Sequence, residues 1–205
     1  MAVVSNGTTI IDAGALGSGV PTGKMTLIKT LTASSSANLS FVDGAASVVL
    51  DDTYDSYVFK FYNMHPATDN VSFTFNMSVD SGSNYNVTKT TTTFRALHDE
   101  ANSEAVLEYD TGQDLAQSTA FQGVLRFIGN GNDESGSGSL TIYNPSSSVF
   151  VKHFIANGNT YYGEDYSFND FTAGYGNTTS AVDAIQFKMS SGNIDSGVIK
   201  LYGVS

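Results

Sequence analysis

The sequence predicts an all-β fold, a jelly-roll or β-sandwich of about eleven strands preceded by an extended N-terminal arm. Short stretches alternate apolar and polar residues with the two-residue period of strands, and turn-forming residues separate these stretches. Hydrophobic residues make up 40% of the chain and charged residues only 14%, whereas a helical bundle would need more Glu, Lys, Leu and Ala. No helical segments alternate with the strands, which argues against a parallel α/β sheet.

The clearest strand signal in the first half lies at residues 71–79. Apolar side chains occupy every second position there, with Ser, Thr and Asn between them, as expected for a strand with one buried face. A Gly-containing turn at 80–86 leads into a Thr-rich segment at 87–94, which we expect to pair with the first as a hairpin. The other strands predicted in this half cover residues 25–31, 37–41, 47–50 and 56–63.

Residues 96–120 are the least strand-like part of the body. They hold most of the helix-compatible residues, and residues 114–117 are expected to form a single helical turn. The last two strands, 184–189 and 197–204, are expected to pair as a hairpin across a polar turn. Because the final strand runs to the end of the chain, we expect it to be a central or well-covered strand whose last side chains complete the core. The other predicted strands cover residues 123–129, 138–144 and 149–156.

Residues 1–24 differ from the body, which is predicted to be one domain covering residues 25–205. They contain several glycines and a proline and have no sustained period, as expected for an arm that ends in a flexible joint. We expect the arm to be an assembly element, most simply one that adds the segment NGTTIID as a strand to a neighbouring sheet edge. Its apolar anchors are Val3, Val4, Ile10, Ile11, Leu16 and Val20.

Charge and composition exclude several classes of function. The chain has 20 acidic and 9 basic residues, a formal net charge of −11, which opposes binding to nucleic acid and to anionic membranes. It contains no cysteine, hence no disulfide and no thiolate metal site. The sequence has no signal peptide and no membrane-spanning apolar run, so we expect synthesis in a cytoplasm.

No catalytic constellation is evident, and we expect a protein without enzymatic activity or cofactor. The three histidines, His65, His98 and His153, lie in a turn, an acidic segment and a predicted strand. The sequence has no G-x-S-x-G motif, and these histidines are read as ordinary surface or strand residues. A carboxylate pair for glycoside hydrolysis stays open as an alternative, because any two strands could supply it.

Two acidic turns are the candidates for a metal site. Neither has the spacing of a calcium-binding loop, and neither is accompanied by a histidine that could complete a zinc site. Solvated turns are therefore the expectation, with a loosely held calcium ion as the alternative. One turn contains Asp51, Asp52 and Asp55, and the other contains Asp133 and Glu134.

A tyrosine-rich segment at residues 159–177 is the candidate recognition loop. Tyrosine among Gly, Asn and Asp is typical of adaptable binding surfaces, because its ring offers contact area and a polar tip at low entropic cost. The alternative is a long hairpin whose aromatic side chains cover a sheet end or a subunit contact. The candidate residues are Tyr161, Tyr162, Tyr166, Phe168 and Tyr175, and Phe171 lies among them.

Three segments carry a family resemblance. The end of the chain, IQFKMSSGNIDSGVIKLYGV (185–204), resembles the close of a jelly-roll domain found in structural proteins of tailed bacteriophages. The segment YDSYVFKFYNMHPATDNVSFTFNMSVDSGSNYN (54–86) resembles an earlier stretch of the same proteins, and the resemblance covers roughly residues 25–205. In the arm, VSNGTTIIDAGAL (4–16) is similar to the opening of virion proteins from marine phages that infect cyanobacteria and related hosts.

The resemblance implies a virion structural protein that assembles as a homotrimer on the head surface or in the tail. No functional residue transfers with it, because such families are defined by architecture. We expect a decoration or cement protein made in the host bacterial cytoplasm, with the major capsid protein or tail proteins as partners. The alternative is a tail-fibre or receptor-binding tip module that recognises host glycans.

Overall fold

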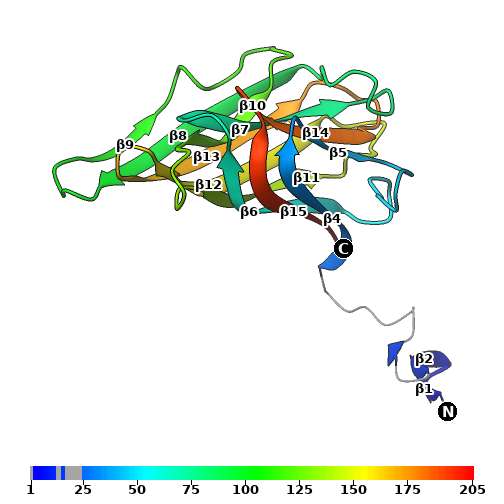
Figure 1. Cartoon of the computed structure of the whole chain (residues 1–205). Coiled ribbons are helices and arrows are strands. Elements are labelled where there is room, and N and C mark those ends of the chain that lie inside the picture. The colour runs from blue at the N-terminus through cyan, green and yellow to red at the C-terminus, as the bar shows by residue number, and fades with distance from the viewer. Residues whose placement is uncertain (1, 13–14, 17–24) are drawn as a thin grey trace.

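The computed structural model describes residues 2–12, 15–16 and 25–205, and every regular element among them is a strand (Figure 1). Twelve strands form the body, and three from the arm form a separate small sheet. None of the described segments is a helix that could span a lipid bilayer. The arm sheet contains β1 (Val3–Ser5), β2 (Thr8–Asp12) and β3 (Ala15–Leu16).

Eight strands of the body form a jelly roll. The first sheet contains β4 (Thr26–Ser36), β15 (Ile194–Val204), β6 (Ser56–Pro66) and β11 (Gly136–Tyr143), in that order. The second contains β5 (Leu39–Val42), β14 (Ala184–Met189), β7 (Val71–Ser78) and β10 (Gln122–Ile128). Strands from the early and late parts of the body alternate in both sheets, which is the arrangement produced by two Greek keys. The predicted fold class is therefore confirmed.

Two inserted hairpins widen the first sheet to eight strands. One consists of β8 (Lys89–Asp99) and β9 (Ala105–Tyr109), between β7 and β10 in the chain. The other consists of β12 (Lys152–Tyr162) and β13 (Tyr166–Gly176), between β11 and β14. They pair in the order β11–β12–β13–β8–β9. We call the four added strands the extension.

Aromatic side chains fill the space between the two jelly-roll sheets. Phe187 on β14 is the most connected of them and is fully buried. Its ring centroid lies 5.3–6.4 Å from those of five other phenylalanines, a spacing at which ring pairs attract one another beyond their burial. The five rings belong to Phe41, Phe59, Phe61, Phe73 and Phe75.

The final strand is central, as predicted. β15 lies between β4 and β6, and its side chains Ile199 and Leu201 are fully buried. The terminal strand thus supplies both the middle of the first sheet and part of the core.

Two predicted hairpins, 71–79 with 87–94 and 184–189 with 197–204, are wrong. β14 and β15 do not pair, because β14 pairs with β5 and β7 while β15 pairs with β4 and β6. β7 and β8 do not pair either. In a jelly roll these connections cross from one sheet to the other, and a polar Gly-containing turn serves a crossing as well as a hairpin.

Three local predictions also differ from the structure. No helical turn forms at 114–117, because this irregular segment exchanges hydrogen bonds with Thr91 on the inner face of the extension. Residues 47–50 are not a strand, although Val48 and Leu50 are buried in the core. β12 begins at Lys152, which leaves Val149 and Phe150 exposed before it.

The polar face of β7 is buried as well, which the predicted single buried face did not anticipate. Asn76 on that face is fully buried and donates to two backbone carbonyls, those of Tyr85 and Thr119, at 2.7 and 2.9 Å. Its carbonyl oxygen accepts a hydrogen bond from the ammonium group of Lys89. Burial lowers the pKa of Lys89 to about 7. The interior next to the extension is therefore polar, unlike the aromatic core.

The substitution Phe75→Ala tests the aromatic core. Phe75 is fully buried and its ring lies 5.0 Å from that of Phe154, so the unfolding free energy should fall by about 3–5 kcal/mol. Urea denaturation measures this loss, with Val79→Ala, at a partly exposed site just after β7, as the control that should change stability little. A loss below about 1 kcal/mol for Phe75→Ala would contradict the packing described.

Candidate functional site

The extension presents a broad outer face that no described element covers. In a strand, alternate side chains point to opposite faces, and the register aligns Ile155 with Ala173 and Thr92 across three strands on this side. We call its exposed hydrophobic side chains the outer apolar face; they are Phe94, Leu107, Tyr109, Tyr143, Ile155 and Phe171. Tyr143 lies on the adjoining strand β11.

Two phenylalanines in the middle of this face stack on each other. Phe94 and Phe171 are register partners, with ring centroids 4.8 Å apart and planes within 7° of parallel. They are nonetheless 42% and 38% exposed, and Leu107 nearby is 75% exposed. Exposed apolar side chains gathered in this way mark interaction surfaces in soluble proteins.

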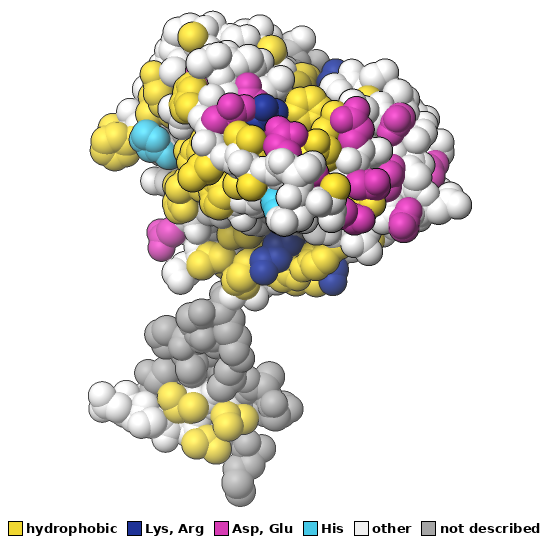
Figure 2. Space-filling model, turned by 90° about the vertical axis from the view of Figure 1, so that its left-hand side faces the viewer, with side chains coloured by type: hydrophobic (Ala, Val, Ile, Leu, Met, Phe, Trp, Pro, Cys, Tyr) yellow, Lys and Arg dark blue, Asp and Glu magenta, His cyan; other side chains and the backbone are white. Residues whose placement is uncertain are grey.

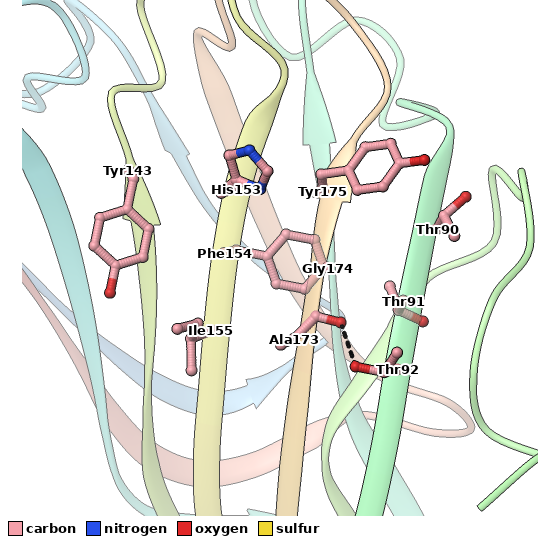
Figure 3. A pocket seen from close by; sticks show the side chains of 10 residues that line it. All are labelled: Thr90, Thr91, Thr92, Tyr143, His153, Phe154, Ile155, Ala173, Gly174 and Tyr175. Carbon is pink, nitrogen blue, oxygen red and sulfur yellow. Dashed lines mark hydrogen bonds between the residues drawn. The ribbon is translucent and has the colours of Figure 1, made fainter.

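A shallow apolar trough of about 470 Å³ lies on the same side of the sheet (Figure 3). Tyr143, Ile155 and His153 border one side of it, and the threonines of β8 border the other. Gly174 forms part of its base, where a β-carbon would lie 2.5 Å from the backbone oxygen of Thr90. A larger residue at this position would therefore displace β8.

The predicted recognition residues do not form one site. They belong to the β12–β13 hairpin, as the alternative prediction held, and strand alternation distributes them over both faces. Phe168 is buried, with its ring 5.2 Å from that of Phe127. Tyr175 borders the trough at one end of the hairpin. The remaining three, Tyr161, Tyr162 and Tyr166, lie together at the other end, next to the turn.

Two cavities lie at this end, on either side of Tyr166. The outer cavity, of about 260 Å³, is bordered by Tyr161, Tyr166 and the acidic residues Asp99 and Glu100, among others. The inner cavity, of about 250 Å³, lies on the opposite face of the hairpin. It is lined by Arg95, Leu97, Glu104, Phe127, Tyr162, Glu164, Tyr166 and Phe168.

Carboxylates surround the tyrosines of this end. The hydroxyl of Tyr161 donates to Asp165 at 2.9 Å, and that of Tyr166 donates to Glu104 at 2.9 Å. The hydrogen bond to Asp165, together with further acidic side chains nearby, raises the pKa of Tyr161 to about 12. Figure 2, which views the molecule from this side, shows acidic side chains close to a band of hydrophobic ones.

The pKa values of the other two tyrosines are raised for related reasons. For Tyr166 the main cause is its hydrogen bond to Glu104, and for Tyr162 it is burial, with the charge of Glu164 next. Carboxylates are thus the main influence on the phenols of Tyr161 and Tyr166, which favours positive charge near these two side chains.

A buried ion-pair network lies next to the inner cavity, which Arg95 of this network lines. Arg126 on β10 is fully buried and donates from its Nε to Asp170 at 2.6 Å and from its Nη1 to Asp110 at 2.7 Å. Its backbone N–H also donates to Asp170 at 2.9 Å. Arg95, which is partly exposed, pairs with Glu108 and reaches Asp110. These contacts join the second sheet to the inner face of the extension.

A backbone irregularity in β10 places two consecutive side chains against the extension. The register with β7 shifts between Leu125 and Ile128, and Phe127 has a φ of +55°, which is unusual for a bulky residue. As a result, Arg126 reaches Asp170 while the ring of Phe127 reaches Tyr162 at 5.5 Å. Sequence reasoning missed both residues, and the only signal was an arginine inside the apolar strand GVLRFIG.

The arm residues lie mostly on the surface of the arm's own sheet. Val3, Val4 and Ile11 are exposed, and Ile10 is half-buried. β2 already pairs with β1 on one side and with β3 on the other, so the arm itself supplies hydrogen bonds to the predicted docking strand. The backbone of Leu16 lies in β3, and Val20 lies outside the described residues.

The acidic turns do not gather their side chains into a cluster of metal-ligand type in the part of the chain that the structure describes. No group of three or more His, Asp or Glu side chains there could hold a metal ion. Asp51 instead accepts a hydrogen bond from the backbone of Thr53, and Glu134 accepts one from Gly131.

The chain was compared with protein-family models, with curated proteins and with solved structures, and no match was found.

The ion pair between Arg126 and Asp170 can be tested by removing one partner or both. Asp170→Ala should lower the unfolding free energy by about 3–5 kcal/mol, because it leaves a buried guanidinium short of a counter-charge. The double variant Arg126→Met/Asp170→Leu should recover much of this loss. Arg95→Met, at a partly exposed site, is the control and should cost about 1 kcal/mol or less. Equal losses for the single and double variants in urea denaturation would contradict the account.

Proposed function

We propose that this chain is a non-enzymatic structural protein of a bacteriophage virion. In this proposal it decorates the head surface as a homotrimer, after synthesis in the host bacterial cytoplasm. The single observation that supports an assembly role best is the outer apolar face, where six large hydrophobic side chains are exposed on one side of a rigid sheet. A surface of this kind favours association with another protein over isolation in water.

The arm supports the same proposal through its own exposed side chains. Val3, Val4 and Ile11 are exposed in a small sheet that lies apart from the twelve-stranded one. Because its own strands pair with one another, the arm needs apolar contacts with a partner more than it needs an additional strand. In the proposal the partner is the major capsid protein or a tail protein.

Exposed sheet edges give a further reason for self-association. β9 pairs only with β8, and its side chains are largely exposed. β4 and β5 are the other edge strands of the body. The chain has few lysines and prolines to protect such edges, so a closed homo-oligomer that covers some of them is the expected assembly.

Deleting residues 1–24 and substituting Ile155→Glu test the two surfaces separately. The deletion should leave the melting temperature of the body nearly unchanged but abolish incorporation into particles made from the genome that encodes the chain.

Ile155→Glu places a charge on an exposed position of the outer apolar face, so it should convert the oligomer to monomer in sedimentation velocity.

Thr30→Glu provides the matched control for the second test. Thr30 is exposed and pairs with Lys200 on the same side of the first sheet, but on the opposite edge strand. It should leave the oligomer intact. A wild-type chain that sediments as a monomer, together with normal incorporation of the truncated chain, would overturn the proposal.

The second candidate function is a receptor-binding module that recognises host glycans. The observation that favours it is the group of Tyr161, Tyr162 and Tyr166 around two cavities bordered by carboxylates. Aromatic rings can stack on sugar rings, and carboxylates can accept hydrogen bonds from sugar hydroxyls.

A glycan array tests this second candidate. Binding that is present in the wild type should disappear in Tyr161→Ala/Tyr162→Ala and persist in Tyr143→Ala, whose site lies beside the trough. Absence of any glycan binding by the wild type, or equal loss in both variants, would rule the candidate out.

A further inference from the structure

We propose that the inner cavity is a binding site for an organic ammonium group. This inference is independent of the proposed virion role, because it rests on the lining of one cavity. Three aromatic side chains at its border are only partly buried, namely Phe127, Tyr162 and Tyr166. Neighbouring centroids lie 5.5 Å apart, both for Phe127 with Tyr162 and for Tyr162 with Tyr166.

The cluster to which these rings belong already attracts cations within the protein. The guanidinium of Arg95 lies 5.6 Å from the ring centroid of Phe168, and that of Arg126 lies 5.3 Å from the same ring and 5.7 Å from that of Phe127. Such distances are those of attractive cation–π pairs. Among the described residues, the rings of Tyr162 and Tyr166 have no such partner, so they are available to a cation from outside.

The charges around the cavity also favour a cation. Its own lining contains Glu104 and Glu164, and neither forms an ion pair in the described part of the chain. The one cation in the lining, Arg95, is already paired with Glu108 and Asp110. The two unpaired carboxylates therefore outnumber the free cations in the lining, and the hydrogen bond to Glu104 raises the pKa of Tyr166 accordingly.

The size of the cavity limits the ligand to a small group. Sites for drug-sized molecules measure roughly 300–1,000 Å³, and this cavity measures about 250 Å³. A single alkylammonium or trimethylammonium group is of suitable size. The strained backbone of Phe127 is consistent with a binding role, since unfavourable φ values concentrate at ligand sites.

Titration of the full-length chain with choline and with 3,3-dimethylbutan-1-ol tests the proposal. The two probes have nearly the same shape, but only choline carries a charge. We expect choline to shift the NMR signals of the aromatic rings of Phe127, Tyr162 and Tyr166 saturably, and to bind about tenfold more tightly than the neutral alcohol at matched ionic strength.

Three variants test whether choline binds in the inner cavity. Glu164→Gln, at an exposed turn position, should weaken choline binding several-fold without disturbing the fold, and Tyr162→Ala should abolish it. Tyr161→Ala is the matched control, because Tyr161 precedes Tyr162 on the same strand but lines the outer cavity. It should leave choline binding unchanged.

The ammonium group can belong to a lysine of a partner protein or to a quaternary ammonium ligand. Titration with Nα-acetyl-lysine methylamide, with and without acetylation of its side chain, distinguishes these two sources. Tighter binding of the unmodified lysine probe than of choline would indicate a lysine of a partner protein, and the reverse would indicate a quaternary ammonium ligand. Acetylation of the side chain should abolish the binding of the lysine probe. Equal affinity for choline and its neutral analogue, no binding of either choline or the unmodified lysine probe, or binding unaffected by both Glu164→Gln and Tyr162→Ala would overturn the proposal.

Discussion

The packing of Phe187 against five other phenylalanine rings is the interaction on which the rest of the structure depends. It holds the two jelly-roll sheets face to face and fixes β14 opposite the strands β6 and β15. The terminal strand can be central because this core receives its side chains Ile199 and Leu201. Because this packing holds the two sheets together, β11 is a fixed edge strand, and the strands of the two inserted hairpins extend the sheet from it.

The second sheet is narrower than the first, which gives the extension its distinct chemistry. β10 meets β12 at a single pair, Ile128 with Tyr162, and the irregular segment after β9 covers part of the remaining inner face. Buried polar groups therefore replace the aromatic core there, with Arg126 and Asp170 at their centre. The outer side of the extension is apolar, and the end next to the turn between β12 and β13 is acidic and aromatic. These two surfaces underlie the proposed assembly and ligand-binding roles.

The sequence was a good guide to which residues face inward and a poor guide to which strands pair. Alternation correctly places Phe73 and Phe75 in the core, because a two-residue period directly reports the buried face of a strand. Alternation carries no information on partner strands, so the sequence does not distinguish the crossings after β7 and β14 from hairpins. The tyrosine-rich segment forms a hairpin, which is the alternative that the sequence offers to a recognition loop. Its residues were nevertheless assigned to one site, although neighbouring positions such as Tyr161 and Tyr162 point to opposite faces. Arg126 could not be predicted as a buried anchor, since its partner Asp170 is distant in sequence and belongs to an inserted hairpin.

The central claim is that the outer apolar face makes protein contacts while the acidic end of the extension faces solvent. A cryo-EM map of the virion to which the chain is proposed to belong tests it most directly. The account predicts density from another subunit against Phe94, Ile155 and Phe171, with the turn around Glu164 free at the particle surface. A map in which the outer apolar face is bare and the acidic end is buried against a neighbour would contradict it.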